Sequence, residues 1–216
     1  MRKYIYLSYF LNKSTPLYGG SVGIEIIKDR DISAGDSANT KFLKLHNHSG
    51  THIDFPNHFI LNGKKSSDYK ADFWIFKNPY VLNIPCEEND IIKLNDSQLK
   101  NIPRDTDFLI LNTGFHKFRQ KKIYWNNNPG VDPSVANQLK KQCPNIKILG
   151  MDFISLTSFQ NREIGRVSHK EFLGKNNILL VEDMDLNLLD YQPEEIMCLP
   201  LMVENIDGCP VTIIAR

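Results

Sequence analysis

The feature that most constrains this chain is a concentration of histidines between residues 46 and 58. Four of the six histidines in the chain, His46, His48, His52 and His58, fall in this stretch together with Asp54. Neutral imidazole nitrogens and carboxylate oxygens are the ligands of zinc and manganese sites in proteins. The first expectation for the chain is therefore a divalent-metal site, which the fold must complete by bending this segment.

The spacing within the stretch predicts an extended, two-sided segment. The histidines and Asp54 occupy even-numbered positions, whereas the apolar residues Ile53, Phe55 and Phe59 occupy odd ones. In an extended chain the two sets face opposite ways, so one face would carry ligands and the other would pack into a core.

A straight strand cannot form the site, because it advances roughly 3.3 Å per residue and would hold His48 and Asp54 about 20 Å apart. Gly50 permits a positive φ angle, and Pro56 ends ladder pairing. A helix would also bring His48 and His52 together. Four residues in this stretch disfavour a helix, namely Gly50, Thr51, Ile53 and Pro56. We therefore expect a strand with a kink at Ser49-Gly50.

Composition and charge exclude several other classes of protein. Lys plus Arg number 26 against 25 Asp plus Glu, which leaves no field to attract nucleic acid. No apolar run approaches the length of about 20 residues that a membrane helix needs. The cysteines share no C-x-x-C spacing, which disfavours a structural Cys/His zinc site and favours reduced thiols and a cytoplasmic location.

Short apolar runs predict the framework of the fold. Phe108 to Leu111, Ile146 to Met151 and Ile178 to Val181 each end in a polar or acidic residue and are typical of buried strands. The apolar run from Tyr4 to Leu11 is short and aromatic, so we interpret it as a first strand rather than a signal peptide. The chain is expected to form one α/β domain over residues 1–216, with a mixed, curved or barrel-like sheet flanked by helices.

Two helices and a hairpin are expected between and after these strands. Asp132 and Pro133 begin one amphipathic helix, which Pro144 ends. Ser168 and Glu171 have the spacing of a capping box, which predicts a second helix with His169 in its first turn. Glu195 to Leu201 and Val211 to Ile214 are expected to form a closing hairpin around the turn signal Asp207-Gly208.

The run from His48 to Phe59, HSGTHIDFPNHF, resembles the H-x-G-T-H-x-D-x-P-x-H motif of the cyclase family, which includes bacterial kynurenine formamidases and is similar to isatin hydrolases. The resemblance extends along the chain in the expected order. Leu7-Ser8 with residues 16–18 is similar to the opening segment of the family, and Gly150-Met151-Asp152 to its G-x-D strand end. His169, followed by the run that ends at Glu182, is similar to its distal H…E pair.

The resemblance implies a cyclase-like fold of the swivelling β/β/α type and a site for one or two zinc or manganese ions. Its ligands would be His48, His52, Asp54, His169 and Glu182, with Asp54 bridging two ions, and His58 would be the acid/base. Without the resemblance, Glu182 is more typical of a solvated strand end, and His169 of either a ligand or an ordinary capping-turn residue. Asp152 is interpreted as a supporting or structural residue, and Asp183 and Asp185 as solvated or turn residues.

The family implies hydrolysis of an amide-type C–N bond in a small molecule, such as an aryl formamide or a cyclic amide. A metal-dependent cyclase or dehydratase and a non-catalytic metal-binding protein are the alternatives. Tyr18 stands where family members usually have a tryptophan that packs on the substrate, so it is a candidate substrate contact. His46 either contacts the substrate or merely shares the strand face. A homo-oligomer, dimer or tetramer, is expected by the same resemblance.

Overall fold

Three of the apolar runs form neighbouring parallel strands at the centre of a mixed, curved sheet. The computed structural model describes residues 3–21 and 23–216. The strands are β1 (Ile5–Tyr6), β2 (Ile24–Arg30), β3 (Thr40–Leu45), β4 (His52–Asp54), β5 (Ile75–Phe76), β6 (Pro79–Asn83), β7 (Ile91–Ile92), β8 (Phe108–Asn112), β9 (Gly130–Val131), β10 (Ile148–Met151), β11 (Leu179–Glu182), β12 (Ile196–Pro200) and β13 (Gly208–Ala215).

The main sheet has nine strands in the order β5-β12-β13-β4-β11-β10-β8-β6, with β1 paired to β13. β6, β8, β10 and β11 run parallel, whereas β4 is antiparallel to both of its neighbours, β11 and β13. The closing hairpin is confirmed, because β12 and β13 pair antiparallel. The predicted first strand is shorter than expected and consists of β1 alone.

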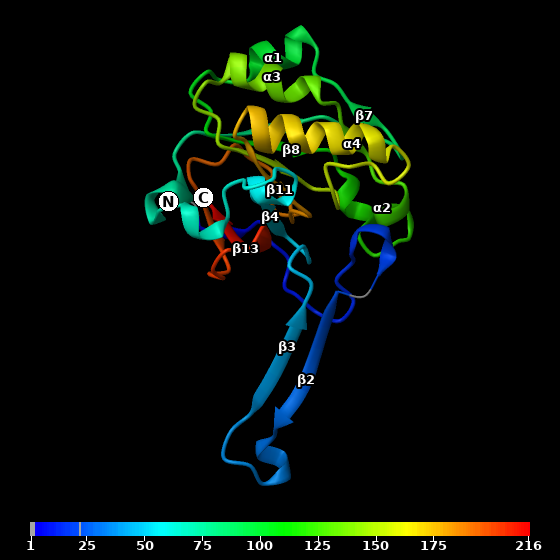
Figure 1. Ribbon diagram of the computed structural model, residues 1–216, viewed down its shortest axis with the longest axis vertical. Coiled ribbons are helices and arrows are strands. Elements are labelled where there is room, and N and C mark those ends of the chain that lie inside the picture. The colour runs from blue at the N-terminus through cyan, green and yellow to red at the C-terminus, as the bar shows by residue number, and fades with distance from the viewer. Residues whose placement is uncertain (1–2, 22) are drawn as a thin grey trace.

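Helices cover the outside of this sheet (Figure 1). They are α1 (Asp96–Asn101), α2 (Ile123–Asn126), α3 (Ser134–Gln142) and α4 (Arg162–His169), and a π-helix, Lys170–Lys175, continues α4. The expected α/β class with a barrel-like mixed sheet flanked by helices is thus confirmed, and α3 corresponds to the helix that Asp132 and Pro133 predicted. None of the described helices is long and apolar enough to cross a membrane.

The prediction of a helix that begins at Ser168 is wrong. The helix begins at Arg162, and Ser168 lies inside it, buried, where its hydroxyl donates to the carbonyl of Val131 at 2.7 Å. His169 is therefore the last residue of α4 rather than part of its first turn. The buried face of α4 consists of Gly165, Ser168 and His169, so apolar periodicity could not reveal its start.

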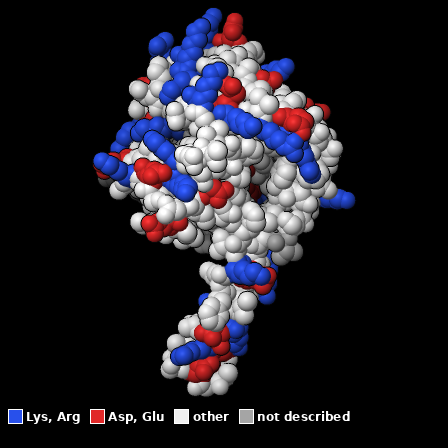
Figure 2. All heavy atoms as spheres, in the orientation of Figure 1, with Lys and Arg blue, Asp and Glu red and all other residues white. Residues whose placement is uncertain are grey.

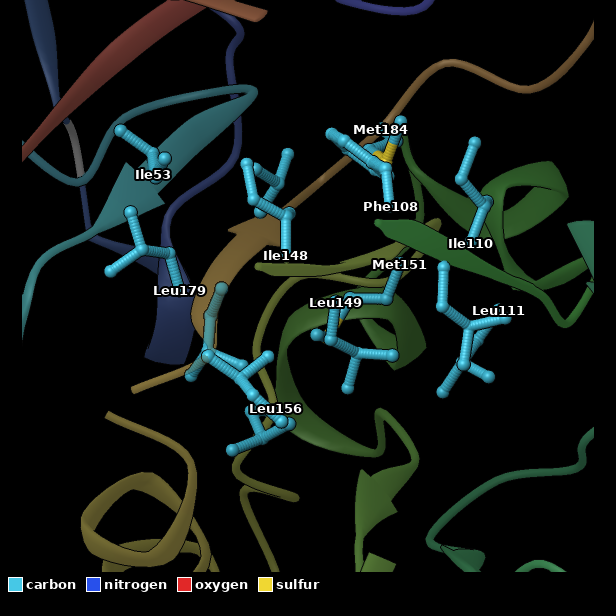
Figure 3. Close-up of a cluster of buried hydrophobic side chains, with 14 of the residues drawn as sticks. Ile53, Phe108, Ile110, Leu111, Ile148, Leu149, Met151, Leu156, Leu179 and Met184 are labelled. Carbon is cyan, nitrogen blue, oxygen red and sulfur yellow. The ribbon is translucent and has the colours of Figure 1, made fainter. Parts of the chain in front are cut away.

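The two faces of the central strands carry different parts of the core. Figure 3 shows Ile110 and Ile148 projecting to one side of the strands and Leu111 and Leu149 to the other, as alternation along a strand requires. All four side chains are fully buried. Burial on both faces explains why these strands read as continuous apolar runs in the sequence.

One hairpin leaves the body of the molecule. Strands β2 and β3 form a separate two-stranded ribbon that extends as an arm from the sheet (Figure 1). Ile27 lies opposite Phe42, and Ile26 opposite Leu43. Ile27, Phe42 and Leu43 are 47%, 63% and 65% exposed, so the arm presents apolar side chains on both of its faces to solvent.

Asp183, interpreted from the sequence as a solvated or turn residue, is buried. Its carboxylate accepts two hydrogen bonds from Arg119, at 2.8 and 2.7 Å, and one from the hydroxyl of Tyr124 at 2.6 Å. Asp183 has a positive φ of 54°, which turns it away from the path of the strand, and its carbonyl accepts a hydrogen bond from Thr51. This contact ties the end of β11 to the residue before β4. Asp185 caps a turn through Asn187, as expected.

Replacing Arg119 should test how strongly this ion pair supports the sheet. Arg119→Met leaves the carboxylate of Asp183 buried without its charged partner, which should lower the free energy of unfolding by about 3 kcal/mol or more. Urea denaturation followed by circular dichroism measures the loss, with the exposed Arg104→Met as the control. The double variant Arg119→Met/Asp183→Asn should recover part of the stability; a single variant as stable as the control would contradict the role given to the pair.

Candidate metal centre

Two adjacent antiparallel strands place three potential ligands on one face of the sheet. His52 lies directly opposite Glu182 in the register of β4 and β11, and Asp54 is two residues from His52 along β4. Because side chains two apart on a strand share a face, all three point the same way, whereas Ile53 and Val181 point into the core. His52, Asp54 and Glu182 are each less than 5% exposed.

The bend that the sequence required lies where it was expected. Gly50 has a positive φ of 63°, and a Cβ there would approach Leu11 to 2.5 Å. The carbonyl of Gly50 accepts a hydrogen bond from Nδ1 of His52 at 2.8 Å. The bend therefore also fixes the tautomer of His52, with Nε2 directed at the two carboxylates.

Helix α4 brings His169 over the same face. Nδ1 of His169 donates to the carbonyl of Gly165 at 2.9 Å and lies 3.2 Å from the hydroxyl of Thr157. A Cβ on Gly165 would overlap the side chain of Thr157, so glycine is needed for this close approach. The neutral tautomer of His169 is thus selected by the helix carbonyl.

His52 and His169 each lie near both carboxylates, at distances longer than a good hydrogen bond, and they face different oxygens of each carboxylate. Nε2 of His52 is 3.5 Å from Asp54 Oδ1 and 3.4 Å from Glu182 Oε2. Nε2 of His169 is 3.6 Å from Asp54 Oδ2 and 3.6 Å from Glu182 Oε1. Ligands about 2.1 Å from a tetrahedral ion lie roughly 3.4 Å from one another. The separations between His52, Asp54 and Glu182 therefore fit the edges of a coordination shell, and His169 lies next to it.

The chemistry of the donors leads to the same conclusion. Because the Nδ1–H groups of His52 and His169 donate to carbonyls, each neutral ring presents a lone pair at Nε2 to carboxylate oxygens. Four buried acceptors directed at one another are unfavourable unless a cation or added protons lie between them. His52, Asp54 and Glu182 also form one of two groups with ligand atoms within 4.8 Å of one another. The residues present fit a divalent ion.

The pKa values of the group reflect the excess of acceptors. Burial alone would lower the pKa of His169, yet contacts with Asp54 and Glu182 raise it to about 9. Burial would raise the pKa of Asp54, but the charge of His48 and the nearness of His169 hold it well below its ordinary value. The carboxylates therefore favour protonation of these histidines, and an ion that binds here displaces the protons.

His48 lies beside this group rather than in it. Its Nδ1 is 2.8 Å from Asp54 Oδ1, and its Nε2 is 3.1 Å from Asp207 Oδ2. Burial alone would lower the pKa of His48, but the two carboxylates raise it to about 10. His48, Asp54 and His58 form the second group with metal-ligand spacing. Asp54 belongs to both groups, an arrangement compatible with a second ion.

Asp207 is the functional candidate that the sequence did not reveal. It was interpreted as part of a turn, but Gly208 already belongs to β13 and pairs with Asp54. Oδ2 of Asp207 accepts from Nδ1 of His58 at 2.9 Å, and its Oδ1 accepts from Asn47. A Cβ on Gly208 would overlap the ring of His48, so the site requires glycine at this position of β13.

A cavity of about 450 Å³ opens over the two groups. His46 is exposed and lines the cavity wall, where its Nδ1 accepts from the backbone N–H of His48 at 3.2 Å. Tyr18 also lines the cavity; its hydroxyl oxygen is buried and has no hydrogen-bond partner among the described residues. Burial raises the pKa of Tyr18, and the positive charge of nearby Arg162 opposes this rise.

The structure brings together all the residues that the sequence nominated. Asp152 lies elsewhere: it is fully buried and accepts hydrogen bonds from Thr113 and His116, which is a structural role. The cavity is lined mainly by the segments 16–21, 46–59 and 154–169. Residues more than a hundred positions apart in the chain therefore meet at one site.

Comparison with known proteins agrees with the motif. A family model described as a putative cyclase matches residues 5–157. The kynurenine formamidase of Geobacillus thermodenitrificans is 25% identical over 211 residues, which cover 98% of this chain and 96% of that protein. The kynurenine formamidase of Bacillus cytotoxicus is 28% identical over 180 residues, covering 83% of this chain and 81% of that protein.

Among solved structures, isatin hydrolase A from Labrenzia aggregata, bound to benzyl benzoate, superposes with a TM-score of 0.83 at 19% identity. The superposition covers 99% of this chain and 93% of that one. At this identity the match shows that the two chains share a fold.

Metal analysis of variants should separate ligands from supporting residues. His52→Ala, Asp54→Asn and Glu182→Gln each remove one of the four converging acceptors and should abolish binding of zinc or manganese after dialysis. Asp207→Asn should retain the ion, since the hydrogen bonds of the Asp207 carboxylate within the described residues go to His48, His58 and Asn47. Elemental analysis by mass spectrometry gives the ion content per chain. Full metal content in Asp54→Asn would contradict the site as described.

Proposed function

Because the chain belongs to the cyclase family, we propose that it is a metal-dependent hydrolase that cleaves an amide-type carbon–nitrogen bond with activated water. The observation that carries the proposal is that His52, His169 and Glu182 line an open cavity and that the buried carboxylate of Asp54 lies against both histidines. A structural metal site is normally closed, whereas a catalytic one keeps a position open to substrate. The similarity to kynurenine formamidases supports the choice of an amide.

The proposed cofactor is zinc or manganese, with one or two ions per chain. His52, Asp54, His169 and Glu182 would hold the first ion, and His48 with Asp54 would contribute to a second. Such an ion, when bound, polarises a carbonyl and lowers the pKa of water from about 15.7 towards roughly 7. Leu156 N–H donates to Oε1 of Glu182 at 2.7 Å, which holds this carboxylate in place.

His58 is the proposed acid/base. The Nδ1–H group of His58 donates a hydrogen bond to Asp207. The Nε2 atom of the same ring, which lines the cavity, is therefore free to take up a proton. Burial lowers the pKa of His58, and the neighbouring charge of His48 adds to this effect against the opposing pull of Asp54. The ring is therefore neutral near pH 7 and can accept a proton from water and return it to the leaving nitrogen.

The proposed substrate is an aryl formamide or a cyclic amide. Leu17, Tyr18, Phe59 and Ile154 line the cavity and offer apolar or aromatic surface to a ring. Tyr18 lies edge-on to Phe159 at 5.3 Å between ring centroids. His46, on the same wall, is placed to contact the substrate.

We further propose that the chain forms one domain and acts in the cytoplasm as a homo-oligomer, a dimer or tetramer. The four cysteines are free thiols, which fits a reducing compartment. A two-stranded ribbon cannot bury its own side chains, and the β2-β3 arm exposes apolar residues on both faces. A second copy of the chain would cover them.

Removing the acid/base should leave the ion in place and slow the reaction. His58→Ala should lower kcat for an aryl formamide by about two to four orders of magnitude, the range of general acid–base catalysis. Asp207→Asn should cause a smaller loss, because it misorients the ring but keeps it. Turnover is followed by release of the aromatic amine, and the metal content is measured on the same samples.

Two results would contradict this assignment. Loss of the ion from His58→Ala would make His58 a ligand of the second group. Wild-type protein that holds metal but hydrolyses no member of a panel of formamides, lactams and esters would leave the cyclase or the binding protein as the better description. The exposed Lys117→Ala serves as the control for nonspecific loss.

Oligomerisation should depend on the arm. Phe42→Asp introduces a charge at a 63% exposed apolar position and should shift the chain towards monomer in multi-angle light scattering. Leu61→Asp, at a position 90% exposed on the body, is the matched control. If the wild type is already a monomer at micromolar concentration, the arm does not join copies of the chain.

A further inference from the structure

The two oxygens of Glu182 have different surroundings. Oε1 accepts hydrogen bonds from the N–H of Leu156 at 2.7 Å and from the hydroxyl of Ser155 at 3.2 Å. Oε2 lies 3.4 Å from Nε2 of His52, and Oε1 lies 3.6 Å from Nε2 of His169. In the neutral tautomers that an ion requires, both of these nitrogens present a lone pair and no proton. The hydrogen-bond donors of Glu182 are therefore gathered on Oε1, and two donors suffice for the two lone pairs of that oxygen.

The hydroxyl of Ser155 is held in a position to donate. Its oxygen accepts a hydrogen bond from the N–H of Thr157 at 3.2 Å, which leaves its own proton for Glu182. The carbonyl of Ser155 accepts from the side-chain amide of Asn128 at 3.2 Å, and the same amide donates to the carbonyl of Thr157 at 2.8 Å. Asn128 is fully buried. The segment 155–157 is therefore fixed from behind by a buried side chain.

The same segment lies between the metal centre, the cavity and the core. Oγ1 of Thr157 is 3.2 Å from Nδ1 of His169, so the segment contacts a candidate histidine ligand as well as the carboxylate. Ser155 and Thr157 line the cavity wall. The side chain of Leu156 belongs to the buried cluster shown in Figure 3, which anchors the backbone between them. A substitution at Ser155 therefore changes the surroundings of a ligand without removing one.

Surface charge does not distinguish between the two oxygens. Figure 2 shows acidic and basic side chains interspersed on the face that it draws, over the body and along the arm. Exposed charges of both signs largely offset one another, and salt screens them over about 10 Å. The donors in direct contact with Glu182 therefore determine which of its oxygens meets an ion.

We propose that Ser155 is a positioning residue of the metal centre. Together with the N–H of Leu156 it occupies Oε1 of Glu182, so that this carboxylate binds an ion through Oε2 alone. A catalytic site keeps a coordination position open for water or substrate. A carboxylate that turned both oxygens to the ion would fill a position that the reaction needs. This proposal rests on the proposed function for the use of that position, and Ser155 takes no part in bond cleavage.

The open position can be measured without turnover. Azide titrated into the cobalt-loaded protein binds at a free coordination position and changes the visible absorption of the ion, which gives its Kd. In Ser155→Ala, Oε1 of Glu182 competes for this position. The Kd of azide should therefore rise roughly tenfold, the lower end of the effect of groups that orient metal ligands, because the N–H of Leu156 remains. The cobalt content per chain should stay at the wild-type level.

Ser158→Ala is the matched control. Ser158 is a buried serine close to the same segment, and its hydroxyl accepts a hydrogen bond from the side chain of Asn161 rather than donating to a ligand. Its azide Kd and cobalt content should equal those of the wild type. The thermal midpoint of each metal-free variant, measured alongside, reports any general loss of structure.

The azide titration separates this proposal from the proposed function. If Ser155→Ala binds azide more weakly at full cobalt content but the wild type hydrolyses no amide, the positioning role stands and the reaction assignment fails. A wild-type azide Kd in Ser155→Ala, or an equal rise in Ser158→Ala, would overturn the positioning role and leave the reaction assignment untouched. Loss of cobalt from Ser155→Ala would overturn it too, since Ser155 would then hold the ion in place instead of keeping a position open.

Discussion

The structure depends on four buried acceptor groups that are held against one another. Two carboxylates and two imidazole lone pairs converge from β4, β11 and α4, at separations of 3.4 to 3.6 Å. Such an arrangement is unfavourable by itself, so the surrounding fold must impose it and a cation must relieve it. The kink at Gly50 and the contact of Gly165 with Thr157 each bring a histidine into position through a carbonyl of the backbone.

Two successive carboxylates at the end of β11 point to opposite faces of the sheet. Glu182 points to the metal centre, and the positive φ of Asp183 directs the next carboxylate into a buried ion pair with Arg119. That pair and the contact between Thr51 and Asp183 fix β11 against the start of β4. The geometry of the centre is therefore supported from the face that carries no ligand, and the substrate cavity remains free on the other.

Patterns local in sequence predicted much of this. Continuous apolar runs predicted β8, β10 and β11. Between residues 48 and 54 the candidate ligands alternate with other residues, and this alternation together with Gly50 predicted a bent strand with its ligands on one side. The start of α4 was missed because its buried face is made of Gly165, Ser168 and His169, which carry no apolar signal. Asp183 and Asp207 were misread because their partners, Arg119 and His58, lie 64 and 149 residues away. Pairing between residues so far apart in the chain cannot be predicted from the sequence around either residue.

The most direct test of the central claim is the position of the ion itself. Anomalous diffraction from crystals of the protein loaded with zinc or manganese, recorded on both sides of the absorption edge, locates the metal without reference to activity. The account predicts a peak about 2.0 to 2.2 Å from Nε2 of His52, Nε2 of His169 and oxygens of Asp54 and Glu182. A fully loaded crystal with no peak at this point, or with its peak at other residues, would contradict it.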